Sequence, residues 1–148
     1  MIKIEETSSF VSAFTALPFI QSLNRYYPDI EYWYVNKVVP GLIVGNDKLL
    51  IAHDNGNIAG IALGKASDGE AKLRCVRVHP DYQNGGLGIR LIDGMLDLIG
   101  ERQPGVTVAE EMINLYSRAF VKRYGFNLSD VTKGRYRQGK LEYGFNGA

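Results

Sequence analysis

Three glycines crowd into the segment from Gln83 to Gly88, which reads QNGGLG. The segment follows an apolar run that ends in Val76-Arg77-Val78, and apolar residues at helical spacing begin after it at Ile89. A strand that leads through such a turn into a helix exposes backbone N–H groups at the helix N-terminus, where negative charge is stabilised. Glycines let an anion approach the backbone closely and accept positive φ angles. The segment therefore predicts phosphate binding, and the alternative is an ordinary tight turn between a strand and a helix.

The surrounding residues exclude two common phosphate-binding motifs. A P-loop needs Lys and then Ser or Thr after its last glycine, whereas Ile89 and Arg90 follow Gly88. A dinucleotide-binding fingerprint that starts at Gly86 needs glycine at the position of Leu91, and the preceding strands are predicted to be antiparallel. The segment does match the pattern Q/R-x-x-G-x-G/A.

The elements that position this turn are predicted from the spacing of apolar residues and from turn signals. Asn55-Gly56 is a strong hairpin signal between two strand-like runs, and residues 67–69 join the second run to a third. The resulting order predicts a single mixed α/β domain over residues 1–148. In sequence order, we expect a strand at 1–6, one or two helices at 9–24 interrupted at Pro18, a loop at 25–46 with a short helix at 32–38, strands at 48–54, 57–66 and 70–80, a helix at 89–100, a strand at 105–110, a helix at 113–126, and a hairpin of strands at 131–137 and 141–146.

Composition limits the classes of function. The 148 residues carry 17 basic and 16 acidic side chains, a net charge of +1, which argues against nucleic acid or a membrane as a partner attracted by overall charge. No apolar stretch is long enough to cross a bilayer and the first ten residues contain no secretion signal, so we expect a cytoplasmic protein. The lone Cys75 has no Cys or His at metal-ligand spacing, so we expect a buried strand thiol and no metal site.

Two blocks of the sequence together resemble the GCN5-related N-acetyltransferase (GNAT) family. The first is the glycine turn behind Val78-His79-Pro80, and the second is Asn114 followed eleven residues later by Gly125-Phe126. The length and the order of the expected elements are also similar to those of the family. The resemblance implies a GNAT-type α/β domain whose central sheet is mixed and mostly antiparallel, with a splayed pair of parallel strands, and is flanked by helices. It also implies direct transfer of the acetyl group of acetyl-CoA to a primary amine, and we expect a small-molecule amine.

In that family the pantetheine arm of the co-substrate lies between the splayed strands, and its pyrophosphate lies on the glycine turn. The resemblance places the arm between the strand Val76-Arg77-Val78 and residues 106–109, with Asn114 bonding near the sulfur. The alternatives are a helix N-cap for Asn114, and for Arg90 an ion pair with Asp93 or Asp97. The residues expected to bind the co-substrate are Val76, Arg77, Val78, Gln83, Asn84, Gly85, Gly86, Leu87, Gly88, Ile89, Arg90 and Asn114.

Two catalytic groups that are frequent in the family are replaced in this sequence. Lys72 and Arg74 occupy the strand positions where a Glu base is frequent, and Val121 occupies the position of a Tyr acid. The nearest groups that could replace them are the hydroxyls of Tyr124 and Tyr116 and the carboxylate of either Glu110 or Glu111. Core packing of the tyrosines and a helix-terminal role for the carboxylates are the alternatives. The predicted catalytic residues are Tyr124, Tyr116 and Glu111.

In the GNAT family the acceptor pocket is walled by the first helices and the loop after them, so the resemblance makes aromatic residues of that loop candidates for the pocket wall. Tyr26, Tyr27 and Trp33 lie close in sequence to the carboxylates of Asp29 and Glu31, and ring faces and carboxylates together can hold an amine cation. We therefore predict substrate binding for the three aromatic residues, with core packing as the alternative.

Two other functions stay open. An acyl-CoA-binding regulator with little turnover would account for the replaced Glu and Tyr. Acetylation of a protein or an aminoacyl-tRNA would suit the locally basic segment 118–140, although the near-neutral net charge speaks against the tRNA version. A solvated surface or a contact with the 3′-phosphate of CoA is the alternative for that segment. Dimers are frequent in the family, so a homodimer stays open as well.

Overall fold

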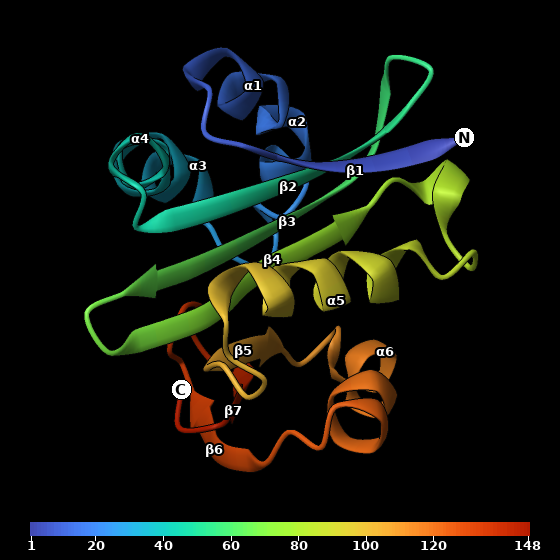
Figure 1. The fold of residues 1–148 in the computed structure, drawn as a ribbon. Helices are drawn as coiled ribbons and strands as arrows, with labels where there is room; N and C mark the ends of the chain where they lie inside the picture. Colours follow the sequence, from blue (N-terminus) through green and yellow to red (C-terminus); the bar gives the residue numbers. More distant parts are fainter.

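The computed structural model describes all residues from 1 to 148 and contains two antiparallel sheets. The first sheet has the order β1-β2-β3-β4, and the second has the order β5-β7-β6. Figure 1 shows the second sheet below the first. This arrangement confirms the predicted α/β class and the mostly antiparallel pairing. The strands are β1 (Ile2–Thr7), β2 (Asp47–Asp54), β3 (Asn57–Ser67), β4 (Glu70–Val78), β5 (Val106–Ala109), β6 (Leu128–Lys133) and β7 (Leu141–Phe145).

Alternation along β2 builds a core on each face of the first sheet, because successive side chains of a strand point to opposite faces. Leu49 and Ile51 pack with the helices that precede β2, whereas Leu50 and Ala52 pack with the helix that follows β4. The predicted hairpin between β2 and β3 is confirmed: Asn55 and Gly56 have φ angles of 49° and 84°, as a two-residue turn of type I′ requires.

Two short helices follow β1, as predicted. Helix α1 (Phe10–Thr15) begins after Ser9, whose hydroxyl accepts a hydrogen bond from the Ser12 N–H. Helix α2 (Leu17–Gln21) contains Pro18 in its first turn, where the missing N–H breaks no helical hydrogen bond.

The prediction of a loop over most of residues 25–46 is wrong. Helix α3 (Ile30–Trp33) continues without a break into a π-helical turn (Tyr34–Val38) and then into α4 (Val39–Val44). Pro40 does not break this segment, because it lies in the first turn of α4, where proline is tolerated. The segment ends only at Gly45, which has a φ of 89°.

Helix α5 (Leu87–Ile99) packs against the opposite face of the sheet from α1 to α4 (Figure 1), after a short 3₁₀ turn (Pro80–Tyr82). It ends at Gly100, as predicted, where φ is 72°. A Cβ at Gly94 would lie 3.1 Å from Leu50 Cδ1. Close packing against β2 therefore accounts for a glycine inside this helix.

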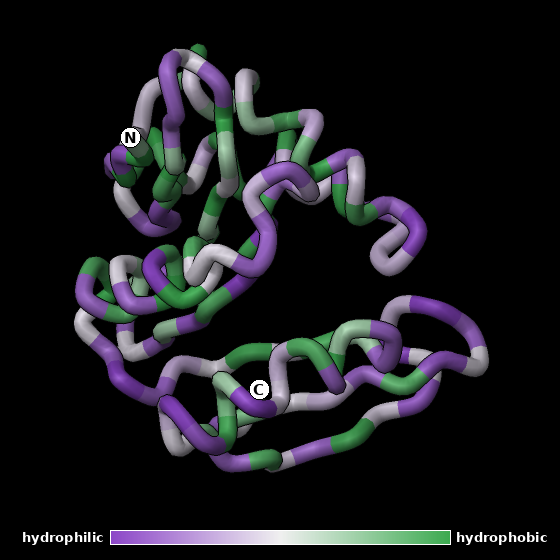
Figure 2. The backbone as a smooth tube through the Cα atoms, turned by 90° about the vertical axis from the view of Figure 1, so that its right-hand side faces the viewer, coloured by the Kyte–Doolittle hydropathy of each residue, from purple (hydrophilic) through white to green (hydrophobic).

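The C-terminal third forms the second sheet and the helix beside it. Helix α6 (Ile113–Ser117) continues as a π-helical turn (Arg118–Arg123) and stops before Gly125, as predicted. The predicted strand at 131–137 is placed wrongly, because Gly134 with a φ of 80° turns the chain after Lys133. In the side view of Figure 2 the two chain ends lie in different layers, with the C-terminus in the lower one.

Candidate active site

Strands β4 and β5 meet at one point and then separate. The Leu73 N–H donates to the Gly105 carbonyl (2.9 Å), and the Gly105 N–H donates to the Ala71 carbonyl (3.0 Å). This single parallel bridge between Lys72 and Gly105 is their only ladder contact, which confirms the predicted splayed parallel pair. A cavity of about 840 Å³ lies in the opening and is lined by β4, β5, α6, residues 23–33 and residues 135–136.

A β-bulge in β4 lies at the start of this opening. Leu73 pairs with Gly64 of β3 and Cys75 pairs with Leu63, so Arg74 is the extra residue of the bulge. The His79 N–H donates to the Ala59 carbonyl (2.8 Å), so His79 is one of the residues whose backbone groups bond to β3. Because bonded and non-bonded pairs alternate in an antiparallel ladder, the N–H and C=O groups of Val76 and Val78 face the opening.

The glycine turn lies just beyond this free edge and is rich in unpaired donors. None of the backbone N–H groups from Asn84 to Ile89 has a hydrogen-bond acceptor in the protein. Asn84 and Gly86 have φ angles of 68° and 80°, so the turn needs residues that tolerate the left-handed region. A Cβ added at Gly85 or Gly88 would meet nothing closer than 3.8 Å, so the space above the turn is open. These donors at the start of a 13-residue helix fit a pyrophosphate.

Side chains of the predicted co-substrate site have separate roles in the structure. The Gln83 side-chain amide donates to the Val78 carbonyl (3.3 Å) and ties the turn to β4. Arg90 is exposed, and Asp93 and Asp97 pair with Arg123 and Arg102, so the ion pairs considered for Arg90 do not form. The side chain of Leu87 is buried beneath the turn, so only its backbone N–H could contact a ligand.

Asn114 lies away from the cavity lining. It is the second residue of α6 and is exposed, and the N-cap of that helix is Met112. The N-cap role considered for Asn114 is therefore wrong, whereas its contact with a co-substrate stays a prediction.

The two predicted catalytic tyrosines lie in different places. Tyr116 lines the cavity, stacks on Phe120 with ring centroids 5.4 Å apart, and donates to the Val76 carbonyl (2.9 Å). Burial raises the pKa of Tyr116 to about 12. Tyr124 lies outside the cavity lining and donates to the Asp93 carboxylate on α5 (2.7 Å); burial and then this hydrogen bond raise its pKa to about 12.

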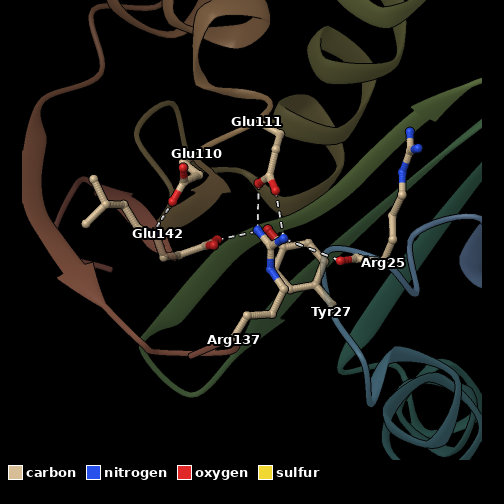
Figure 3. A network of polar contacts seen from close by, with 7 residues as sticks. Arg25, Tyr27, Glu110, Glu111, Arg137 and Glu142 are labelled. Carbon is tan, nitrogen blue, oxygen red and sulfur yellow. Dashed lines mark hydrogen bonds and ion pairs between the residues drawn. The ribbon is translucent and has the colours of Figure 1, made fainter. Parts of the chain in front are cut away.

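Glu111 forms a bidentate ion pair with Arg137, with N–O distances of 2.6 and 2.7 Å. Hydrogen bonds from Arg137 lower the pKa of Glu111 to about 2. The adjacent Glu110 accepts from the Leu141 N–H (2.6 Å), as Figure 3 shows beside the Glu111 pair. Both carboxylates are therefore engaged in joining the segment after β5 to the segment around β7.

The three predicted substrate residues, Tyr26, Tyr27 and Trp33, all line the cavity. The Tyr27 hydroxyl donates to the Glu142 carboxylate of β7 at 2.8 Å (Figure 3). Glu142 is 5% exposed, and burial raises the pKa of its carboxyl group. Tyr136 packs edge-on against Tyr27, with ring centroids 5.2 Å apart. The predicted aromatic wall thus continues onto the loop before β7.

The overall pattern is a strand edge and a donor-rich turn at one end of a cavity with an aromatic wall. The family model that matches residues 9–126 is that of the acetyltransferase (GNAT) family. The chain belongs to the GNAT family.

Solved structures are similar to this GNAT chain over nearly its whole length. A GNAT-family protein from Desulfovibrio desulfuricans is 21% identical, covers 98% of this chain and 97% of its own, and has a TM-score of 0.74. The ribosomal-protein-S18-alanine N-acetyltransferase from Escherichia coli is 20% identical over 98% and 92%, with a TM-score of 0.69. The PaiA N-acetyltransferase from Thermoplasma acidophilum, in complex with coenzyme A, is 17% identical over 96% and 98%, with a TM-score of 0.67. Among curated proteins no sequence matches this chain significantly.

Sequence reasoning missed Glu142 as a residue of this GNAT site. In the run LEYGF the apolar residues alternate with Glu142, a pattern that favours a solvent-facing glutamate. The carboxylate is instead buried and accepts a hydrogen bond from Tyr27. No local signal identifies this burial, because the two residues are 115 positions apart.

Three further observations complete the description of the GNAT chain. Cys75 lies on β4 as predicted, although the residue is partly rather than fully buried. Burial raises the pKa of its thiol to about 12, so this cavity-lining residue is a poor nucleophile. No group of three or more His, Cys, Asp or Glu side chains is placed to hold a metal ion. None of the helices is both long enough and apolar enough to span a membrane.

Proposed function

We propose that this GNAT chain is an acetyl-CoA-dependent N-acetyltransferase, acting as one domain of residues 1–148, that acetylates a primary amine of a small molecule. The observation that carries the proposal is the free edge of β4, which connects a row of unpaired N–H groups at Asn84–Ile89 to an 840 Å³ cavity. Acetyl-CoA supplies an activated thioester, and direct attack by the amine forms the C–N bond while the C–S bond breaks.

The glycine turn and the free edge of β4 would bind different parts of acetyl-CoA. The N–H groups of Asn84 to Ile89 are the donors for the pyrophosphate, assisted by the dipole of α5. The N–H groups of Val76 and Val78 face the opening and would bond to the pantetheine arm as a neighbouring strand would. One of them would also stabilise the negative charge that develops on the thioester oxygen.

Tyr116 is the best placed of the predicted acid groups, because its hydroxyl reaches the β4 edge from inside the cavity. With a pKa of about 12, it keeps its proton over the whole working range of pH. A thiol has an ordinary pKa of about 8.5, so complete proton transfer from Tyr116 is unfavourable. Tyr116 would instead turn its single hydroxyl proton from the Val76 carbonyl to the leaving thiolate and stabilise it by a hydrogen bond. Tyr124 stays a second prediction, with its hydroxyl held by Asp93.

The pair of Tyr27 and Glu142 offers a route for the proton that the amine must lose. Tyr27 lines the cavity, and its hydroxyl proton already points to the Glu142 carboxylate. Transfer of the amine proton to Tyr27, together with transfer of the tyrosine proton to Glu142, leaves both residues uncharged. Glu111 is a weaker candidate for this role, because its pKa near 2 makes it a poor proton acceptor.

Two measurements test the proposal: thermal stabilisation of the protein by CoA, and release of thiol from acetyl-CoA with a panel of primary amines. Stabilisation together with amine-dependent release supports an acetyltransferase. Stabilisation without release for any amine or peptide favours the acyl-CoA-binding regulator. Release only with peptides points to a protein acceptor, and no stabilisation by CoA contradicts both readings. A homodimer and a cytoplasmic location stay predictions.

A further inference from the structure

Arg74 occupies a special position in the cavity. As the extra residue of the β4 bulge, it lies two residues after the bridge at which β4 and β5 separate. Bulges change the direction of a side chain relative to the regular alternation of a strand. The Arg74 side chain lines the cavity at the place where the free edge of β4 begins.

The guanidinium group of Arg74 has unused hydrogen-bonding capacity. Its side chain is 20% exposed, and its Nε lies 3.6 Å from the Asp47 carboxylate without forming a hydrogen bond. Its other neighbour is the Trp33 ring, whose centroid is 5.4 Å from the guanidinium carbon. Arginine carries five N–H donors, and a planar anion can bind two of them in parallel. The long ion pair with Asp47 and the contact with Trp33 therefore leave N–H donors of Arg74 free to bind an anion in the cavity.

The charged side chains around the cavity also favour an anion. Four are cationic and two are acidic, and one of the acidic groups, Glu70, is paired with Lys65 at 2.8 Å and lies 3.5 Å from Lys72. An acceptor that carries only an amine would gain nothing from such a wall. An acceptor that also carries a carboxylate would be held by it. The charged lining residues are Asp29, Glu70, Lys72, Arg74, Arg77 and Arg135.

We propose that Arg74 binds the carboxylate of the acceptor, so that the acceptors of this enzyme are amino acids rather than simple alkylamines. The inference rests on the proposed acetyltransferase function. The Trp33 ring lies against the guanidinium group, and Tyr26, Tyr27 and Tyr136 provide the aromatic wall for the rest of the acceptor. The amine of the amino acid then has access to Tyr27 and the Glu142 carboxylate behind it.

The test compares each L-amino acid with its α-amide as acceptor, because the amide keeps the amine and the side chain but removes the negative charge. For the wild type we expect kcat/KM to be about 10- to 100-fold higher for the amino acid, as a hydrogen-bonded charge pair is worth. Arg74→Gln should abolish this preference and leave the KM for acetyl-CoA unchanged. Arg74→Lys should keep part of it, because a lysine keeps the charge but not the planar fork.

Controls separate recognition from folding. Arg102→Gln removes an exposed arginine that pairs with Asp97 far from the cavity lining, and it should keep the full preference. Asp47→Asn removes the long ion pair and leaves Arg74 in place, so it should keep the preference too. Because the readout is a ratio of two acceptors in one variant, partial unfolding does not change it.

Several outcomes contradict the inference. Equal or better turnover of the amides by the wild type overturns it and leaves the acetyltransferase proposal intact, as does a preference that survives in Arg74→Gln. Turnover confined to peptides with an acidic first residue would assign Arg74 to a protein acceptor and would likewise overturn it. Absence of thiol release with every amine contradicts the proposed function itself.

Discussion

The Tyr116 hydroxyl donates a hydrogen bond of 2.9 Å to the Val76 carbonyl and so connects α6 to the free edge of β4 across the opening. This contact places a phenol next to the strand on which the thioester is proposed to lie. The π-helical turn that follows α6 brings Phe120 into the cavity lining beneath Tyr116 and leaves Val121 half exposed on the other side. Tyr116 therefore supplies a phenol from a position different from the one that the family resemblance indicates.

Removal of this hydroxyl should slow catalysis. For Tyr116→Phe we expect kcat to fall about 10- to 100-fold with an unchanged KM for acetyl-CoA, because a hydrogen bond to a charged group is lost in the transition state only. Steady-state thiol release is the measurement. Tyr32→Phe, at a residue that is 69% exposed, is the matched control and should behave as the wild type. A wild-type kcat in Tyr116→Phe would rule out this role.

A negative charge on the glycine turn should prevent CoA binding. Gly86→Glu places a carboxylate beside the unpaired N–H groups, so we expect the Kd for CoA to rise at least 100-fold, measured by calorimetry. Gly45→Glu is the control, since Gly45 also has a positive φ (89° against 80°) and no atom near its Cβ position. Both variants should lose about 1–2 kcal/mol of stability from the same backbone strain. Equal CoA affinity in the two variants would refute the pyrophosphate assignment.

The pair of Glu111 and Arg137 should make stability depend on acid pH. The folded pKa of Glu111, about 2, lies below its ordinary value of 4.5. The ionised group therefore stabilises the fold above pH 4.5, and this contribution disappears as the pH falls toward 2. Glu111→Gln should cost about 1 kcal/mol at pH 7, a value that allows for solvent screening, and progressively less below pH 4.5. Urea unfolding at pH 7, 4.5 and 3 measures the change, and a cost that is independent of pH would contradict it.

Glu142 should have the opposite pH dependence. Burial raises its folded pKa, so its contribution to stability is complete below the ordinary value of 4.5 and is lost as the pH rises through the folded pKa. Relative to the wild type, Glu142→Gln should therefore become more stable as the pH rises from 4 to 8, because its amide oxygen still accepts from Tyr27 and carries no charge. Glu5→Gln on the exposed side of β1 is the control. A difference between Glu142→Gln and the wild type that stays constant with pH would show that Glu142 does not titrate in this range.

Much of the fold follows from local patterns. The Asn55-Gly56 hairpin, the strand before the glycine turn, and α5 with its glycine end were all predicted, because each depends on residues adjacent in sequence. The loop predicted over residues 25–46 was wrong because Pro40 does not interrupt the helical segment. It follows a π-helical turn and lies in the first turn of α4, where its missing N–H breaks no hydrogen bond. The hairpin strand predicted to reach residue 137 failed because Gly134 turns the chain early.

For the candidate site, too, some features follow from the local sequence and others only from the packing of distant segments. The turn with its row of unpaired N–H groups was determined by the sequence itself, since three glycines and a helix start impose that geometry on contiguous residues. Only the tertiary structure decided which side chains surround the cavity. Tyr27 meets Glu142 across 115 positions, Tyr116 meets Val76 across 40, and Arg74 enters the cavity through a bulge that appears only when β4 pairs with β3. Backbone preferences act between neighbours in the chain, whereas these contacts depend on how separate elements pack, and no run of adjacent residues encodes that packing.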